Sequence, residues 1–279
     1  MASRSSAPAL ARRNRVGLHL ALFTACVVLG LPVLYAALVS TQTNPEVFRY
    51  QMTPGSALGS NFQLVWEARS LGTFMMNSLV QSVVITVGKT ILSLLAGLAF
   101  VYFRFPGKWI VFGFVLVTLL MPTEISILAL FRIVSGIGWN DSLLGLTVPF
   151  FASATGAFLF RQHFANLSPE LSEAAQLDGA SPMQFLFRIL IPLSWNVIGA
   201  LAVIQFVYGW NMYLWPLLIV SDQRSQLVQV GLGTLLSTGQ SQTYGPLMLG
   251  ALLASLPPIA VFVALQKPFM SGFAVGTDK

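Results

Sequence analysis

Long apolar stretches, which few charged residues interrupt, divide the sequence. The stretch at 16–39 is long enough to cross a bilayer as a helix, which takes about 20 mainly apolar residues. Comparable stretches follow at 74–100, 109–131, 143–160, 197–220 and 246–265. Only 9% of the 279 residues are charged, far below the share of roughly a quarter in soluble domains. The pattern predicts an all-α, polytopic membrane protein with six transmembrane helices in one bundle at 16–266.

The basic residues predict the orientation of this bundle. We expect a disordered tail at 1–15 and a short tail at 267–279, both in the cytoplasm. Cytoplasmic loops of membrane proteins carry an excess of Lys and Arg. Six spans would place ten basic residues inside, and Arg49, Arg69 and Arg224 outside. The ten are Arg4, Arg12, Arg13, Arg15, Arg104, Lys108, Arg161, Arg188, Lys267 and Lys279. This topology places 162–192 in the cytoplasm, 41–70 and 221–244 outside, and a break in the last span at Pro257-Pro258.

The polar segment 162–192 has the signals of two short helices joined by a glycine. Ser168 is a good N-cap residue, and Pro169 suits the first helical position. Glu170 and Glu173 fall in the opening turns, where acidic side chains favour the helix dipole. Gly179 then stands where a helix ends in a left-handed residue.

A second helix is predicted directly after this glycine. Ser181 and Gln184 match a capping box, with Pro182 at the first helical position. We expect Pro192 to end the helix. Such a helix pair outside the bilayer is suited to a groove on another protein. The apolar side chains that we expect it to present are Phe185, Leu186, Ile189 and Leu190.

The same segment carries a family resemblance. Glu173-Ala174-Ala175, then Asp178-Gly179-Ala180, then Ile191-Pro192-Leu193 resemble the EAA loop of ABC-importer permeases. The resemblance implies a type I importer permease whose coupling helices, between spans four and five, dock on an ATPase subunit. The coupling residues that it implies are Glu170, Glu173, Ala174, Ala175, Asp178, Gly179, Ala180, Ser181, Pro182 and Phe185.

Other stretches resemble the carbohydrate-type branch of that family, which includes the smaller membrane subunit of maltose importers. Within this branch, the sequence is most similar to the second membrane subunit of sn-glycerol-3-phosphate importers. The stretches are Tyr102-Phe103-Arg104-Phe105-Pro106, Ala152-Ser153-Ala154-Thr155, Phe158-Leu159-Phe160-Arg161-Gln162, Asp178-Gly179-Ala180-Ser181-Pro182-Met183 and Tyr208-Gly209-Trp210-Asn211. The implied function is that of a membrane-spanning permease subunit. It would form half of the pathway for sn-glycerol-3-phosphate or a sugar in a bacterial cytoplasmic (inner) membrane. Ser126 stands close after Glu124, where the glycerol-phosphate branch carries a basic residue, so a sugar stays open.

The resemblance also implies partners: a second, different permease subunit, an ATPase dimer and an extracytoplasmic solute-binding protein. Membrane lipids surround such a subunit, and no nucleic acid is implied. ATP and Mg²⁺ would belong to the ATPase, with no cofactor in this chain. Gly88-Lys89-Thr90 resembles the end of a phosphate-binding loop, but Val83 stands where the pattern needs glycine, within an apolar stretch.

Three features are candidates for the solute pathway. Glu124 follows Pro122 inside an apolar stretch, where an ionisable residue marks a pathway or a structural pair. Lys89 could pair with an acid, reach the interface or line the path. The stretch Tyr208-Gly209-Trp210-Asn211-Met212-Tyr213-Leu214-Trp215-Pro216 combines rings and an amide that suit a polyol or sugar, although it could also be an interfacial aromatic belt. Gln205 would share a helix face with Gly209.

Two other classes of function are less compatible with the sequence. A secondary transporter, the main alternative, usually shows internal repeats with interrupted helices at matching positions, and no such symmetry is visible. An enzyme is not expected, because no nucleophile–base pair, metal-ligand spacing or nucleotide fingerprint occurs. The single cysteine, Cys26, permits neither an intrachain disulfide nor a cysteine metal site.

Overall fold

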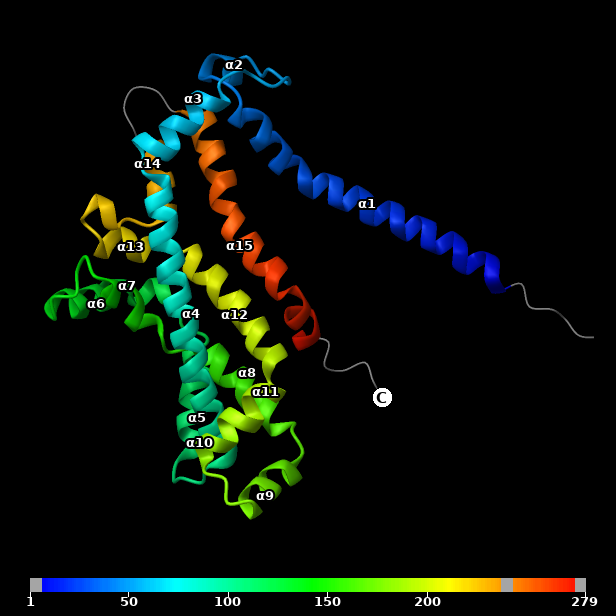
Figure 1. The fold of residues 1–279 in the computed structure, drawn as a ribbon, viewed down its shortest axis with the longest axis vertical. Coiled ribbons are helices and arrows are strands. Elements are labelled where there is room, and N and C mark those ends of the chain that lie inside the picture. The colour runs from blue at the N-terminus through cyan, green and yellow to red at the C-terminus, as the bar shows by residue number, and fades with distance from the viewer. Residues whose placement is uncertain (1–6, 237–242, 274–279) are drawn as a thin grey trace, which may run out of the picture. The chain divides into compact units, whose positions relative to one another are not determined.

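The computed structural model describes residues 7–236 and 243–273, and every regular element in these ranges is a helix (Figure 1). The all-α prediction is thereby confirmed for the described chain. The helices belong to two compact units. Unit 1 contains residues up to Arg69 and Leu235–Leu253, and unit 2 contains Ser70–Thr234 and the residues from Ala254 onward.

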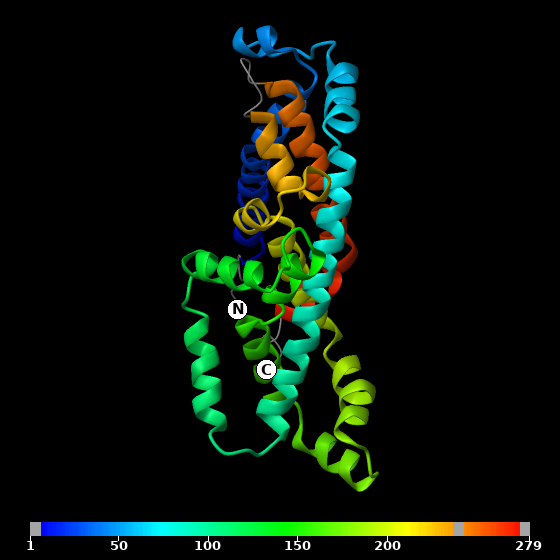
Figure 2. The ribbon, with the colours of Figure 1, turned by 90° about the vertical axis from the view of Figure 1, so that its left-hand side faces the viewer.

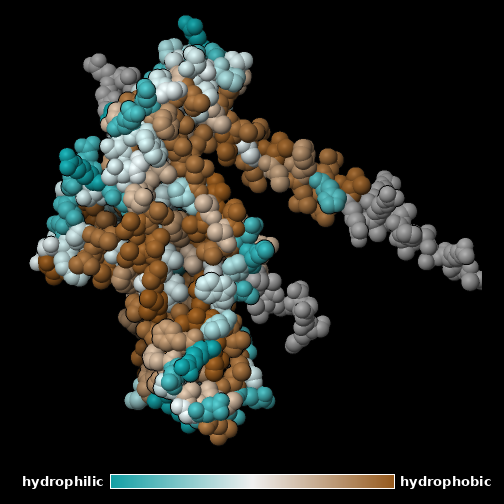
Figure 3. All heavy atoms as spheres, viewed as in Figure 1, coloured by the Kyte–Doolittle hydropathy of each residue, from teal (hydrophilic) through white to brown (hydrophobic). Residues whose placement is uncertain are grey.

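Unit 1 holds the long helix α1 (Ala7–Ser40), the short helices α2 (Asn44–Phe48) and α3 (Leu58–Gln63), the π-helical turn η1 (Leu64–Ala68) and the beginning of α15 (Tyr244–Phe273). α1 begins at Ala7, so the prediction of a disordered tail is wrong for 7–15. The predominantly brown surface of α1 in Figure 3 agrees with its predicted role as a membrane span.

Buried amides fix the predicted external loop of unit 1. Asn61 Nδ2 donates to the carbonyl oxygens of Ser40 at 2.9 Å and Gln42 at 3.1 Å. Gln42 Nε2 in turn donates to the carbonyl oxygens of Gln51 and Thr53. These bonds supply partners for carbonyl groups at the end of α1 and in the loop that follows it.

Unit 2 is built on α4 (Leu71–Tyr102), which packs against α8 (Ala154–Ala165) and α12 (Trp195–Trp210), as Figure 2 shows. Gly209 permits this approach, because a Cβ there would meet Ser82 Cα of α4 at 3.1 Å. The other helices of unit 2 are α5 (Lys108–Thr118), α6 (Thr123–Gly136), α7 (Leu143–Thr147), η2 (Val148–Phe150), α9 (Pro169–Leu177), α10 (Pro182–Phe185), η3 (Leu186–Leu190), α11 (Ile191–Leu193), α13 (Leu214–Ile219), η4 (Gln223–Ser225) and most of α14 (Val228–Leu236).

Breaks divide three of the predicted spans. The third consists of α5 and α6, separated at Pro122, and the fourth consists of α7 with η2 and α8, which meet at 45°. The fifth ends as a helix at Trp210, where Asn211 Nδ2 donates to the Val207 carbonyl oxygen, and α13 continues beyond it. The sixth span was expected to break at Pro257-Pro258, but α15 runs through both prolines, so that prediction is wrong.

The number of membrane crossings stays a prediction. In the described residues, α1, α4 and α15 are each long and apolar enough to cross a bilayer. Two bent helix pairs raise the possible number to 5, by length and composition alone. One pair is α7 with α8, and the other joins the segment 182–193 to α12 at 80°.

Candidate functional site

A cavity of about 750 Å³ opens within unit 2. Its wall comes from α4, α6, η2, α12 and α13, and residues at the breaks in the fourth and fifth predicted spans line it. The lining residues are Lys89, Ser126, Ile127, Ala129, Leu130, Ile133, Pro149, Phe150, Ala152, Val207, Tyr208, Asn211, Met212, Tyr213, Leu214 and Trp215. A mostly apolar, aromatic hollow with a few polar groups is typical of a small-molecule site.

Lys89 is held in the cavity wall by two neutral groups. Its Nζ donates to Gln205 Oε1 at 2.9 Å and lies 4.0 Å from the centroid of the Tyr208 ring. Gln205 Nε2 donates to Ser153 Oγ at 3.2 Å, and this hydroxyl also caps α8 by accepting from the Gly156 amide. Lys89 of α4 and Ser153 at the start of α8 therefore fix the orientation of the Gln205 amide on α12, with its oxygen toward the lysine.

The structure brings together some of the predicted pathway residues and separates others. Tyr208 and Asn211 line the cavity, and Gln205 acts on it through Lys89. Trp210 is buried elsewhere and donates from Nε1 to the Ala254 carbonyl oxygen, and Gly209 faces Ser82. Glu124 lies in the first turn of α6, but its side chain is outside the described residues.

Sequence reasoning left Lys89 undecided and missed Phe150, although the predicted aromatic stretch included Tyr213 and Trp215. Phe150 and Trp215 pack edge to face with centroids 5.6 Å apart, and Trp215 Nε1 donates to the Gly145 carbonyl oxygen. The signal that could have found Lys89 was its charge in the middle of an apolar span. Nothing local marks Phe150, because it reaches the cavity only through the packing of η2.

The segment 162–192 is a helix pair, as the sequence predicts. Gly179 has φ +71°, which is the left-handed conformation expected after α9. Ser181 Oγ accepts from the Gln184 amide at 3.3 Å, and Gln184 Oε1 accepts from the Ser181 amide at 2.8 Å. The capping box is thereby confirmed, whereas Ser168 stands at the N-cap of α9 without a side-chain hydrogen bond.

Two expectations for the second helix are wrong. Phe185, Leu186 and Leu190 do not point outward, because they are buried in a core with Phe160 and Phe164 of α8. The Phe185 ring lies edge to face with Tyr102, with centroids 5.0 Å apart.

Pro192 does not end this helix, which runs on to Leu193 of α11. The preceding turn η3 is a π-helix, and such a turn accommodates a proline that lacks an N–H donor.

The residues that the helix pair exposes are not the apolar residues that we expected it to present. Ala175 is buried and Ala180 is half-buried. Leu177, which the sequence argument did not single out, is 90% exposed at the end of α9. The predicted coupling residues that are exposed are Glu170, Glu173, Ala174, Asp178, Gly179, Ser181 and Pro182.

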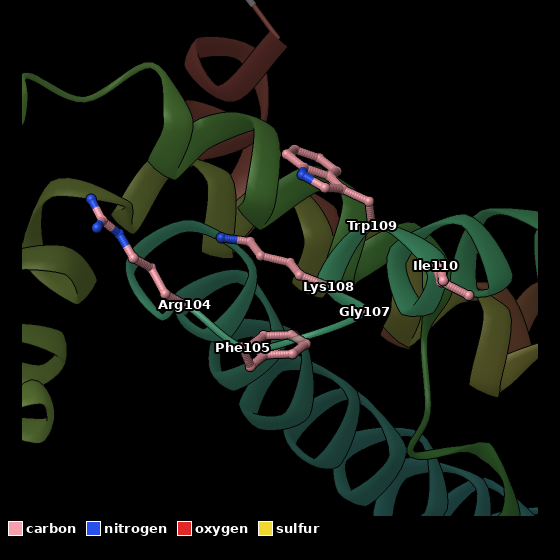
Figure 4. A pocket seen from close by; sticks show the side chains of 6 residues that line it. All are labelled: Arg104, Phe105, Gly107, Lys108, Trp109 and Ile110. Carbon is pink, nitrogen blue, oxygen red and sulfur yellow. The ribbon is translucent and has the colours of Figure 1, made fainter.

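A second hollow of about 480 Å³ lies at the turn between α4 and α5 (Figure 4). Arg104, Phe105, Gly107, Lys108, Trp109 and Ile110 line it. The Arg161 guanidinium lies 5.4 Å from the Trp109 ring centroid. Partial burial lowers the pKa of Lys108, and the positive charges of Arg161 and Arg104 lower it further. Tyr102 joins this basic turn to Phe185, so the turn and the helix pair occupy the same end of unit 2.

Comparison with known proteins identifies the family of the chain. The family described as "Binding-protein-dependent transport system inner membrane component" matches residues 89–271, which include the cavity lysine and the whole helix pair. The chain belongs to this family. It is therefore a membrane permease component of a binding-protein-dependent transport system, as predicted, and not a secondary transporter.

Relatives over the full length agree with this membership. The chain is 40% identical over 272 residues to the sn-glycerol-3-phosphate transport system permease protein UgpE of Pectobacterium atrosepticum, covering 93% of this chain and 97% of the relative. It is 38% identical over 276 residues to the protein of that name from Rhizobium meliloti, covering 95% and 97%.

The fold is also that of a solved importer. A bacterial ABC transporter involved in the import of the acidic polysaccharide alginate superposes with a TM-score of 0.77 at 20% identity, covering 96% of this chain and 99% of that chain. The same type of transporter, in complex with an alginate pentasaccharide-bound periplasmic protein, gives a TM-score of 0.62 at 15% identity. The type I permease fold predicted for this chain is confirmed.

Proposed function

We propose that this permease forms half of a translocation pathway and that a second, different permease subunit forms the other half. A pair of ATPase subunits docks on the segment 162–192 and supplies ATP hydrolysis with Mg²⁺. An extracytoplasmic solute-binding protein delivers sn-glycerol-3-phosphate or a sugar. The chain itself holds no cofactor and no catalytic residue. Both of its termini lie in the cytoplasm.

The exposed Leu177 is the observation that carries this proposal. The segment buries Phe185, Leu186 and Leu190 but leaves Leu177 90% exposed, more than Phe187 at 65% or Met183 at 48%. In Figure 3, hydrophilic and hydrophobic residues are mixed at the end of unit 2 that carries α9 and α10. An apolar side chain that stands exposed beside polar residues such as Asp178 is suited to a pocket on a partner.

The acidic residues of α9 strengthen this interpretation. Glu170 and Glu173 are exposed in the first turns of the helix. Their carboxylates stabilise the helix at its N-terminal end and remain available to basic groups of an ATPase. The family membership, whose description names a binding-protein-dependent transport system, supports the delivery of solute by a binding protein.

Co-purification from membranes tests the docking. We expect the wild-type chain to retain a stoichiometric ATPase, and we expect Leu177→Asp and Glu173→Lys to lose it along with solute uptake. The amount of inserted protein should not change, because both side chains are exposed and contribute little to the folded chain. Leu58→Asp is the matched control, since Leu58 is an exposed leucine in the predicted external loop.

Labelling of a single cysteine tests the orientation. Gln176 is exposed, so in a Cys26→Ser background a Gln176→Cys variant should react with a membrane-impermeant thiol reagent only after permeabilisation. Reaction in intact cells would place the loop outside the membrane. That result would contradict docking on a cytoplasmic ATPase.

A further inference from the structure

Lys89 gives the cavity a positive charge. It is the only charged residue among the described residues that line the cavity, and it is 8% exposed. It lies near the middle of α4, which is long and apolar enough to span the membrane. A cation at such a depth is costly, and proteins retain one where it serves a pathway or a pair.

The contacts of Lys89 with Gln205 and Tyr208 hold its ammonium without cancelling the charge. Gln205 contributes a neutral amide oxygen, and Tyr208 contributes the face of a ring. Both interactions favour a cation, but neither brings a negative charge. Because an ammonium has three N–H donors, its one hydrogen bond to the side chains that the structure describes, to Gln205, leaves donors for a ligand. The bond from Gln205 to Ser153 keeps the amide from turning its own donors toward the lysine.

We propose that Lys89 binds the anionic group of the transported solute and selects small organic anions, such as phosphate monoesters of polyols. This inference rests on the proposed function and narrows its choice between glycerol phosphate and a neutral sugar. Lysine binds phosphate as a compact point charge. The volume of about 750 Å³ lies within the usual range for small-ligand sites. Tyr208, Tyr213 and Trp215 offer aromatic surface to the carbon chain of such a solute.

Uptake by the complete complex in reconstituted vesicles tests this role, with labelled sn-glycerol-3-phosphate and maltose as probes. Lys89→Met should lower the maximal rate of glycerol-phosphate uptake about tenfold or more, the ratio expected for loss of a charge-assisted hydrogen bond. Solute-stimulated ATP hydrolysis should fall by the same factor. Basal ATP hydrolysis and the amount of complex should not change. The solute concentration at half-maximal uptake should change little, because the solute-binding protein sets it.

Matched variants separate binding from packing. Lys89→Arg keeps the charge and should restore most of the uptake. Tyr208→Leu removes the ring that lies on the ammonium and should lower uptake. Lys108→Met removes a lysine at the turn between α4 and α5, outside the cavity, and should transport normally. Equal loss of complex, basal hydrolysis and uptake in both Lys89→Met and Lys89→Arg would overturn the inference in favour of helix packing.

Two further outcomes would contradict the inference. If the double variant Lys89→Met with Glu124→Gln regained wild-type uptake, the role of the lysine would be to neutralise Glu124. If the wild-type complex imported maltose but not glycerol phosphate, the anion site would be wrong while the proposed function held. Absence of a stoichiometric ATPase, by contrast, would remove the proposed function and this inference with it.

Discussion

The coupling segment 162–192 and the Lys89 cavity lie in the same unit, but their geometry has different origins. In the segment, the bonds that shape the backbone are local, because Ser181 and Gln184 cap the helix that they begin. In the cavity, the bond that orients the charge joins Lys89 to Gln205 across 116 positions of sequence. A substitution at an exposed position of the segment, such as Leu177, should therefore alter docking and leave the fold intact. A substitution in the cavity acts on a network whose members lie far apart in the sequence.

The largest expected effect on uptake among these variants comes from Gly179→Val. The glycine has φ +71°, and no atom lies within 4 Å of an added Cβ, so the cost falls on the backbone alone. A left-handed residue with a side chain costs roughly 1–2 kcal/mol, and β-branching adds to this. We expect normal amounts of complex but uptake about tenfold lower or worse, since about 1.4 kcal/mol of docking free energy is a factor of ten.

Gly107→Val is the control for this prediction. Gly107 also has a left-handed φ, of +72°, with no atom within 4 Å of an added Cβ, but it lies in the turn between α4 and α5. It should carry the same backbone cost and retain uptake. Equal loss of uptake in both variants would mean that backbone strain, rather than docking, limits transport.

The next effect is on stability and separates the buried and exposed faces of the coupling helices. Phe185→Ala should lower the free energy of unfolding by about 3 kcal/mol, because a buried aromatic leaves a cavity. Phe187→Ala should change it by less than about 0.5 kcal/mol, because Phe187 is exposed. Thermal unfolding of the purified complex measures both. Equal shifts would mean that a partner buries Phe187 in the complex.

A smaller effect on uptake is expected at the edge of the cavity. Asn211 lines it while its amide bonds Val207 and Gln229, and Glu124 begins the neighbouring helix α6. Asn211→Ala and Glu124→Gln should lower uptake severalfold, while assembly and basal ATP hydrolysis persist. Wild-type uptake in both would remove them from the pathway. Loss of assembly would indicate a structural role for the position concerned.

The smallest effect tests how local the coupling segment is. Ser181→Ala removes a capping box and should cost about 1 kcal/mol of stability. Ser168→Ala should cost almost nothing, because the Ser168 side chain makes no capping bond. The difference between the two melting temperatures is the measurement. If the two serines contributed equally, the capping geometry would not decide the stability of these helices.

The sequence by itself determined the class of the protein and the backbone of its coupling segment. Long apolar stretches require helices in a bilayer, since backbone polar groups find no other partners there. The turn at Gly179 and the capping box at Ser181 were predictable because their causes lie within four residues. The family resemblance that these residues carry was confirmed by the match over residues 89–271.

Only the tertiary structure decided which way side chains point and which distant residues meet. Periodicity did not reveal that Phe185 packs on Tyr102 whereas Leu177 faces outward, because both are apolar residues of short helices. Nor did it show that Trp210 turns to Ala254 while Tyr208 covers Lys89. The physical reason is that α4, α8 and α12 are apolar on most of their surface. Close approaches such as that of Gly209 to Ser82, rather than an amphipathic pattern, fix which faces meet.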